Sequence, residues 1–176
     1  VLFNNQPTLD TLIIMSRAHQ QYGSTAILPT LITDDLATMQ LAADAVASAI
    51  DANVRGIIGI HFEGPHLSQP KKVIHPTQHI RQISHEEIAI FKRTDLGLVC
   101  VTLAPENVSV ELIEELVNAK VKGCLGHSNA TAAQTFAALQ AGAQGFTHLF
   151  NAMSPLQSRE AGMVGAALLD LSSYCG

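Results

Sequence analysis

Three metal-ligating residue types stand where apolar, β-rich runs of the sequence end. Glu63 follows GIIGIHF, His127 follows KGCLG, and His148 lies inside GFTHLF. In parallel α/β folds the carboxyl ends of the strands face one crevice, so we expect these three side chains to converge there. One carboxylate and two imidazoles form a ligand set of catalytic zinc, which leaves a position open for water. The pattern predicts a metal–water site, although each residue taken alone also fits a satisfied core histidine or a turn-capping carboxylate.

The remaining histidines lack this placement. His19 lies in a polar helical segment, while His79 and His85 flank a loop and a helix start, so we expect all three to be solvated. His61 is two positions before Glu63 and points the same way if both lie in a strand. We interpret His61 as a supporting or packing residue.

Two segments carry groups suited to an anion. The GHSNAT sequence at 126–131 precedes a helical pattern, where free backbone N–H groups can meet a negative charge. Asn151 and Arg159 lie in HLFNAMSPLQSRE and offer an amide and a guanidinium fork for a phosphate or carboxylate. A turn asparagine and a solvated arginine remain the alternative.

The elements that must position these residues alternate along the chain. Short buried runs at 24–31, 55–62, 97–103, 122–126 and 145–150 predict strands. Helical patterns lie before and between them, five in all, which is typical of βαβ units and a parallel sheet. The helix signals are a cap at Thr33, the capping-box pairs Ser84 with Glu87 and Thr131 with Gln134, helical segments at 8–22 and 109–119, and stops at Gly23 and Gly142.

This alternation leaves two architectures, an open doubly wound sheet or a (β/α)8 barrel of the TIM type. A barrel needs about 250 residues, whereas this chain has 176 and offers five strands and a sixth from Ser173. We therefore expect one α/β unit over residues 1–176, a partial barrel of five to six βα units. The region 67–82, with three proline turns, predicts a single long loop.

Composition excludes several classes of protein. Charged residues make up 14% of the chain and hydrophobic residues 47%, yet no run approaches the roughly 18 apolar residues of a membrane span. The net charge of −5 and the lack of a basic block argue against nucleic acid. GxSxG, P-loop and GxGxxG motifs are absent, and no targeting segment is visible. Cys100, Cys124 and Cys175 form no CxxC, so we expect reduced core thiols and a cytoplasmic location.

Five ordered motifs resemble one family. LPTLIT, GIHFEGPHL, VTLAPE, GHSNAT and THLFNAMSPLQSRE are together similar to the N-acetylglucosamine-6-phosphate deacetylases of the amidohydrolase superfamily, over essentially the whole chain. The family's enzymes are longer, so the resemblance implies an internal part of a metal-dependent barrel. It also implies a small β-domain and flanking strands outside this chain.

The resemblance assigns roles residue by residue. The family's metal ligands fall on Glu63, His127 and His148, the trio reached above from placement. Its substrate contacts fall on Ile74, His75, Asn151, Ala152 and Arg159. In the family, the arginine at the position of Arg159 reaches the phosphate bound in the neighbouring subunit of a homodimer.

The long loop departs from the family pattern. The family's usual KKGxHNP reads KKVIHPT here, with Val73 for glycine and Pro76 for asparagine. Glycine permits backbone angles that valine resists, so this difference bears on the path of the loop and of His75.

The implied reaction converts N-acetylglucosamine 6-phosphate into glucosamine 6-phosphate and acetate. The cofactor is a divalent metal, with zinc first and iron, cobalt or nickel also accepted by this ligand type. The family's acid/base aspartate falls beyond Gly176, so we expect no catalytic residue in this chain and little activity from it alone. Two alternatives stay open: another amidohydrolase acting on a cyclic amide, and a non-catalytic sugar-phosphate-binding domain.

Overall fold

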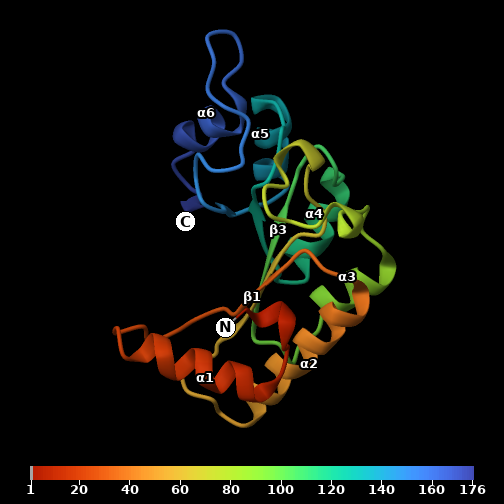
Figure 1. The fold of residues 1–176 in the computed structure, drawn as a ribbon. Helices are drawn as coiled ribbons and strands as arrows, with labels where there is room; N and C mark the ends of the chain where they lie inside the picture. Colours follow the sequence, from red (N-terminus) through yellow and green to blue (C-terminus); the bar gives the residue numbers. More distant parts are fainter. Residues whose placement is uncertain (1) are drawn as a thin grey trace.

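The computed structural model describes residues 2–176 and contains one sheet of six parallel strands (Figure 1). The strands occur in the sheet in their order along the chain. A doubly wound sheet reverses its order at a switch point, whereas barrel strands follow one another, so this order favours the partial barrel. The strands are β1 (Thr30–Ile32), β2 (Gly59–Glu63), β3 (Leu98–Leu103), β4 (Lys122–Leu125), β5 (Gly145–Phe146) and β6 (Tyr174–Cys175).

Helices follow one another around the sheet, from α1 in red to α6 in blue (Figure 1). They are α1 (Leu9–Gln20), α2 (Leu36–Asp51), α3 (His85–Phe91), α4 (Val110–Asn118), α5 (Ala132–Gln140) and α6 (Gly162–Leu169), with short 3-10 turns at Phe3–Asn5, Gln69–Lys71 and Thr77–His79. The loop predicted at 67–82 therefore contains two of these turns.

Local signals placed most helix ends correctly. Both predicted capping boxes form, at the starts of α3 and α5, and Ser109 caps α4. Gly23 and Gly142 adopt φ of +90° and +100° shortly after α1 and α5, as expected for helix stops.

The predicted cap at Thr33 is wrong. Asp35 caps α2 by accepting from the backbone N–H of Thr38, two residues further along. The Thr33 hydroxyl is instead engaged with His75 and with the Glu63 carbonyl. A tertiary contact thus decided between two residues that are both good helix caps.

Three strand predictions, at 24–31, 55–62 and 145–150, were too long, and one helix was missed. The first run shortens to Thr30–Ile32, because Pro29 just before it has no N–H to donate to a sheet. The last shortens to Gly145–Phe146, because the backbone turns at His148 with φ of +42°. Helix α6 was missed because six of its eight residues are buried, which leaves no polar stripe to reveal a helical period.

The two faces of the sheet differ in chemistry. Ile60 and Phe62 of β2 and Val101 of β3 are fully buried in the apolar core. Side chains alternate along a strand, so Glu63 of β2 and Cys100 of β3 belong to the other face. This second face corresponds to the barrel interior and carries the polar groups.

The prediction that Cys100 and Cys124 are buried core residues is wrong. Both thiols are only partly buried, and Cys175 is exposed. Their strand positions place Cys100 and Cys124 on the polar face rather than among the residues under the helices, and both line a cavity there.

Candidate metal centre

The predicted trio comes from the carboxyl ends of three strands at one edge of the sheet. Glu63 is the last residue of β2, and His127 and His148 each follow a strand, β4 and β5, by two residues. Both histidines have a left-handed backbone, with φ of +46° and +42°. Non-glycine residues in this region cost free energy and cluster at functional sites. The turn at each histidine ends the preceding strand and directs the chain across the carboxyl edge of the sheet.

The ligand atoms of this trio converge on a single point. Nε2 of His127 lies 2.9 Å from Oε1 of Glu63, and Nε2 of His148 lies 3.1 Å from the same oxygen. The two Nε2 atoms are 2.9 Å apart. Four-coordinate zinc with bonds of about 2.0–2.1 Å separates its ligand atoms by about 3.3 Å, so small shifts of these side chains would admit an ion.

The hydrogen bond of the second nitrogen of each ring determines whether Nε2 presents a hydrogen or a lone pair to the place where the ligand atoms converge. Nδ1 of His127 lies 2.8 Å from the Lys71 carbonyl, and Nδ1 of His148 lies 2.9 Å from the Asn151 carbonyl. A carbonyl only accepts, so each Nδ1 carries a hydrogen and each neutral ring presents an Nε2 lone pair. Two lone pairs and a carboxylate then face one another. This donor set fits a divalent cation, which would remove the repulsion among the three.

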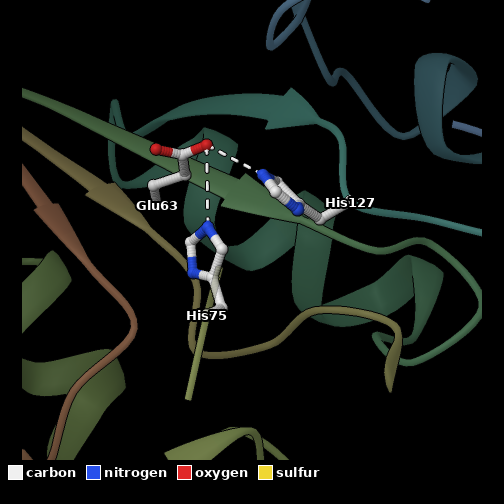
Figure 2. A group of neighbouring side chains, drawn as sticks. All are labelled: Glu63, His75 and His127. Atoms are coloured by element: carbon white, nitrogen blue, oxygen red, sulfur yellow. Dashed lines mark hydrogen bonds and ion pairs between the residues drawn. The ribbon is translucent and has the colours of Figure 1, made fainter. Parts of the chain in front are cut away.

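A fourth residue, His75, reaches the same carboxylate. The ligand atoms of Glu63, His75 and His127 lie within 4.8 Å of one another, which makes them a possible metal site (Figure 2). His75 is buried, its Nε2 is 3.9 Å from Oε1 of Glu63, and its ring packs edge-on against His127. Figure 2 shows the carboxylate oxygen between the two imidazoles.

The hydrogen bonds of His75 distinguish it from the other two rings. Its Nδ1 accepts from the backbone N–H of Thr33 at 3.3 Å and lies 2.8 Å from the Thr33 hydroxyl. A neutral ring with an accepting Nδ1 carries its hydrogen on Nε2. His75 therefore presents a donor to the site, whereas His127 and His148 present lone pairs.

Burial and charge set the protonation of this cluster. Burial raises the pKa of Glu63, but two effects outweigh it and lower the pKa to about 2: a hydrogen bond from the protonated form of His127, which carries hydrogen on both ring nitrogens, and the charges of the surrounding imidazoles when they are protonated. Burial, with repulsion from His127, lowers the pKa of His75 to about 4. At neutral pH the site thus holds an anionic carboxylate and a neutral His75, the forms that suit a cation and a hydrogen-bond donor.

A chain of polar side chains lies beneath the cluster. His61 contacts the hydroxyl of Thr30 in β1 at 3.1 Å and that of Thr102 in β3 at 2.7 Å. The Thr102 hydroxyl lies 2.7 Å from that of Thr147, the residue before His148. His61 therefore links β2, which carries Glu63, to both neighbouring strands, and through Thr102 and Thr147 to the residue before His148.

Glu106 was not predicted from the sequence as part of the site. Its carboxylate accepts from the Ser128 hydroxyl at 2.6 Å and from the Asn129 N–H at 2.6 Å. It thereby fixes the turn that follows His127 and occupies one of the backbone N–H groups of the GHSNAT segment. The available signal was its position: Glu106 follows the strand predicted at 97–103, much as Glu63 stands at the end of its own strand.

The predicted substrate residues fall into two groups. His75 is in the cluster, and Asn151 and Ala152 adjoin it through hydrogen bonds of their backbone carbonyls to His148 and Ser128. Ile74 is exposed beside them on the long loop. Arg159 is also exposed, and within residues 2–176 no hydrogen bond or ion pair ties its side chain to the cluster.

Comparison with known proteins identifies the relatives of this chain. No protein-family model matches it. It is 56% identical over 176 residues to an N-acetylgalactosamine-6-phosphate deacetylase of Shewanella, and 37% identical over 177 residues to an N-acetylglucosamine-6-phosphate deacetylase of Haemophilus influenzae. The alignments cover 100% of this chain. The chain is a homologue of these sugar-phosphate deacetylases.

Solved deacetylase structures carry the same fold. The Pasteurella multocida N-acetylglucosamine-6-phosphate deacetylase superposes with a TM-score of 0.93 at 36% identity, over 99% of this chain. A variant of the Mycobacterium smegmatis enzyme in complex with N-acetyl-D-glucosamine-6-phosphate gives 0.83 at 35% identity. The chain spans about half the length of these deacetylases, 45% and 46% of the two sequence relatives and 46% and 42% of the two structures. Within residues 2–176, no helix has the length and apolarity of a membrane span.

Proposed function

We propose that this chain is part of a metal-dependent deacetylase that converts N-acetylglucosamine 6-phosphate into glucosamine 6-phosphate and acetate. The observation that carries the proposal is the convergence of Glu63 Oε1 with Nε2 of His127 and of His148, all within 3.1 Å, while both Nδ1 atoms are tied to backbone carbonyls. Homology to deacetylases of this substrate class supports the same reaction.

In this proposal Glu63, His127 and His148 hold the metal, with zinc first and iron, cobalt or nickel as further candidates. A bound divalent metal supplies Lewis-acid polarisation of the amide carbonyl and a water of lowered pKa. The lone pairs of His127 and His148 face the ion because their Nδ1–H groups are held by carbonyls. His75 takes no part in ligation and directs its Nε2–H toward the substrate oxygen.

The remaining residues position the substrate. The Ile74 backbone, Asn151 and Ala152 surround the sugar beside the cluster, and Arg159 reaches the phosphate of the neighbouring subunit in a homodimer. The exposure of Arg159 is consistent with a role between subunits. We place the acid/base aspartate that moves the proton to the leaving amine beyond Gly176. The free thiols of the chain fit a cytoplasmic location.

A second substrate, N-acetylgalactosamine 6-phosphate, is favoured by the 56% identity to a deacetylase of that name. The two sugars differ only in the configuration at C4 and share the acetamide and the phosphate that the site would address. The ratio of kcat/KM values for the two substrates, measured on the protein that contains this chain, decides which of them is preferred.

Metal content tests the proposal most directly. We expect Glu63→Gln to lose about one equivalent of the divalent metal that the purified chain holds, and the control Glu114→Gln, which changes an exposed carboxylate of α4, to lose none. Absence of metal from the unsubstituted chain would contradict the proposal.

Calorimetry separates the remaining alternatives. A cyclic-amide amidohydrolase would not bind the sugar phosphate. A binding module would bind it equally well with chelator present, whereas the proposed deacetylase would bind it more weakly once the metal is removed.

A further inference from the structure

Two thiols meet on the polar face of the sheet, in a cluster that the deacetylase site does not use. The Sγ atoms of Cys100 in β3 and Cys124 in β4 are 3.5 Å apart. Among the described residues each sulfur has the other as its only hydrogen-bond partner. Cys100 pairs in register with His61, two residues before Glu63 on β2, so by strand register Cys100 lies deeper in the barrel than the carboxylate. Cys124 pairs with Thr102, the residue that also pairs with Glu63.

We propose that Cys100 and Cys124 form a two-thiolate site for a soft divalent metal ion such as zinc or cadmium, distinct from the centre at Glu63. Thiolates are the ligands that such ions prefer. Two sulfurs that bind one tetrahedral ion at about 2.3 Å stand about 3.8 Å apart. The observed 3.5 Å separation is about 0.3 Å from that value, a change that side-chain rotation alone supplies.

The geometry disfavours a disulfide between the same residues. Cys124 pairs in register with Thr102, and Cys100 pairs with Lys122, so the two cysteines are diagonal neighbours. Diagonal positions on adjacent strands are about 7–8 Å apart. A disulfide requires Cα atoms closer than about 7 Å and sulfurs at about 2.05 Å, so it would need the backbone to move. An ion between the sulfurs requires no such movement.

The surroundings leave room for an ion and for its remaining ligands. Both cysteines line a cavity of about 510 Å³ on the polar face, where water can complete the coordination. The sulfur–sulfur hydrogen bond lowers the pKa of the Cys124 thiol and raises that of Cys100, so Cys124 is the thiol that gives up its proton first. Binding releases the thiol protons to solvent: two R–SH and M²⁺ give M(SR)₂ and two H⁺.

Cadmium titration of the purified chain tests the site, with the ultraviolet thiolate-to-cadmium charge-transfer band as the readout. We expect one equivalent to produce the band and Glu63→Gln to leave it unchanged, because an imidazole–carboxylate site produces no such band. Cys100→Ser and Cys124→Ser should each reduce the band at least about tenfold at equal cadmium. Cys175→Ser is the control: Cys175 lines the same cavity from β6 but is exposed and does not belong to the Cys100–Cys124 pair.

A full band in both Cys100→Ser and Cys124→Ser, or no band in the unsubstituted chain, would overturn the proposal. A second measurement needs no substitution and so does not depend on how the variants fold. Maleimide labelling of the native chain, mapped by peptide mass spectrometry, should be blocked by cadmium at Cys100 and Cys124 but not at Cys175. Equal labelling of all three with and without cadmium would also refute the site.

Discussion

The backbone N–H of Thr33 donates to Nδ1 of His75, and this one contact determines which nitrogen of His75 faces the candidate metal centre. A backbone amide has no lone pair to offer in return, so the neutral ring must carry its hydrogen on Nε2. Nε2 of His75 thus lies 3.9 Å from the Glu63 carboxylate, near enough to belong to the cluster, but it presents a hydrogen where a ligand presents a lone pair.

This difference predicts unequal effects of histidine substitutions on metal binding. His148→Ala should weaken metal binding by more than about 100-fold, because even the hydrogen-bond partner of a ligand contributes about 10–100-fold. His75→Ala should change the affinity by less than about tenfold. Metal content and competition with a chelator of known affinity measure both effects. Equal losses in the two variants would mean that His75 is a ligand.

The loop at Val73 is predicted to gain stability from glycine. Val73 has φ of +49°, a left-handed backbone that costs free energy for valine. Its side chain is exposed, so burial offsets little of this cost. Such strain costs about 1–3 kcal/mol, of which the greater freedom of unfolded glycine offsets part. Val73→Gly should raise the free energy of unfolding by about 1 kcal/mol in urea titrations. Val110→Gly, on the right-handed backbone of α4, is the control and should give no gain.

A buried ion pair should contribute more to stability than an exposed one. The guanidinium of Arg81 contacts Glu87 at 2.6 Å, and Glu87 is 1% exposed, whereas Arg93 binds Asp95, which is 56% exposed. Arg81→Met leaves a buried carboxylate without its partner and should cost about 2–4 kcal/mol. Arg93→Met should cost about 0–1 kcal/mol. Chemical unfolding of both variants measures the difference, and equal costs would contradict this account of Glu87.

The stability of the chain should fall as the pH drops below about 6.5, partly because of His66. Burial lowers the pKa of His66, against the opposing effect of Glu87, and its Nε2 has no hydrogen-bond partner. The unfolded chain therefore takes up this proton at a higher pH than the native chain, which favours unfolding as the solution becomes more acidic. Each unit of lowered pKa corresponds to about 1.4 kcal/mol.

The variant His66→Asn isolates this contribution. Its amide can replace Nδ1–H as donor to the Arg81 carbonyl but cannot titrate. Unfolding free energies measured at about pH 7.5 and 5.5 should differ less in His66→Asn than in the unsubstituted chain. An unchanged difference would show that His66 does not titrate on unfolding in this range.

The sequence allowed prediction of those parts of the site that depend on strand order and strand ends. Glu63, His127 and His148 each follow an apolar run, and parallel strands bring such positions to one edge whatever the details of packing. Local helix signals were similarly reliable where a cap contacts only its own helix, as at Ser84 and Thr131.

Several of the missed features depend on tertiary contacts that the local sequence does not reveal. Thr33 was assigned to a helix start because its local sequence fits one, but His75, 42 residues later, engages its hydroxyl. Cys100 and Cys124 were assigned to the core by their apolar neighbours, since periodicity alone does not tell which face of a strand is apolar when both faces are covered. Arg81 and Glu87 form their buried pair only once the long loop closes.

The two outermost strands have a consequence for handling this chain. β1 pairs only with β2 and β6 only with β5, so each has backbone N–H and C=O groups along one side that no described strand satisfies. Such edges can recruit strands from other copies. Two features limit this here: β1 and β6 are short, and the Asn4 side chain already hydrogen-bonds the N–H and C=O of Ile32 in β1. At high protein concentration, intermolecular strand pairing therefore competes with the monomer. The metal and thiol measurements belong in dilute solution, with light scattering as a check on association.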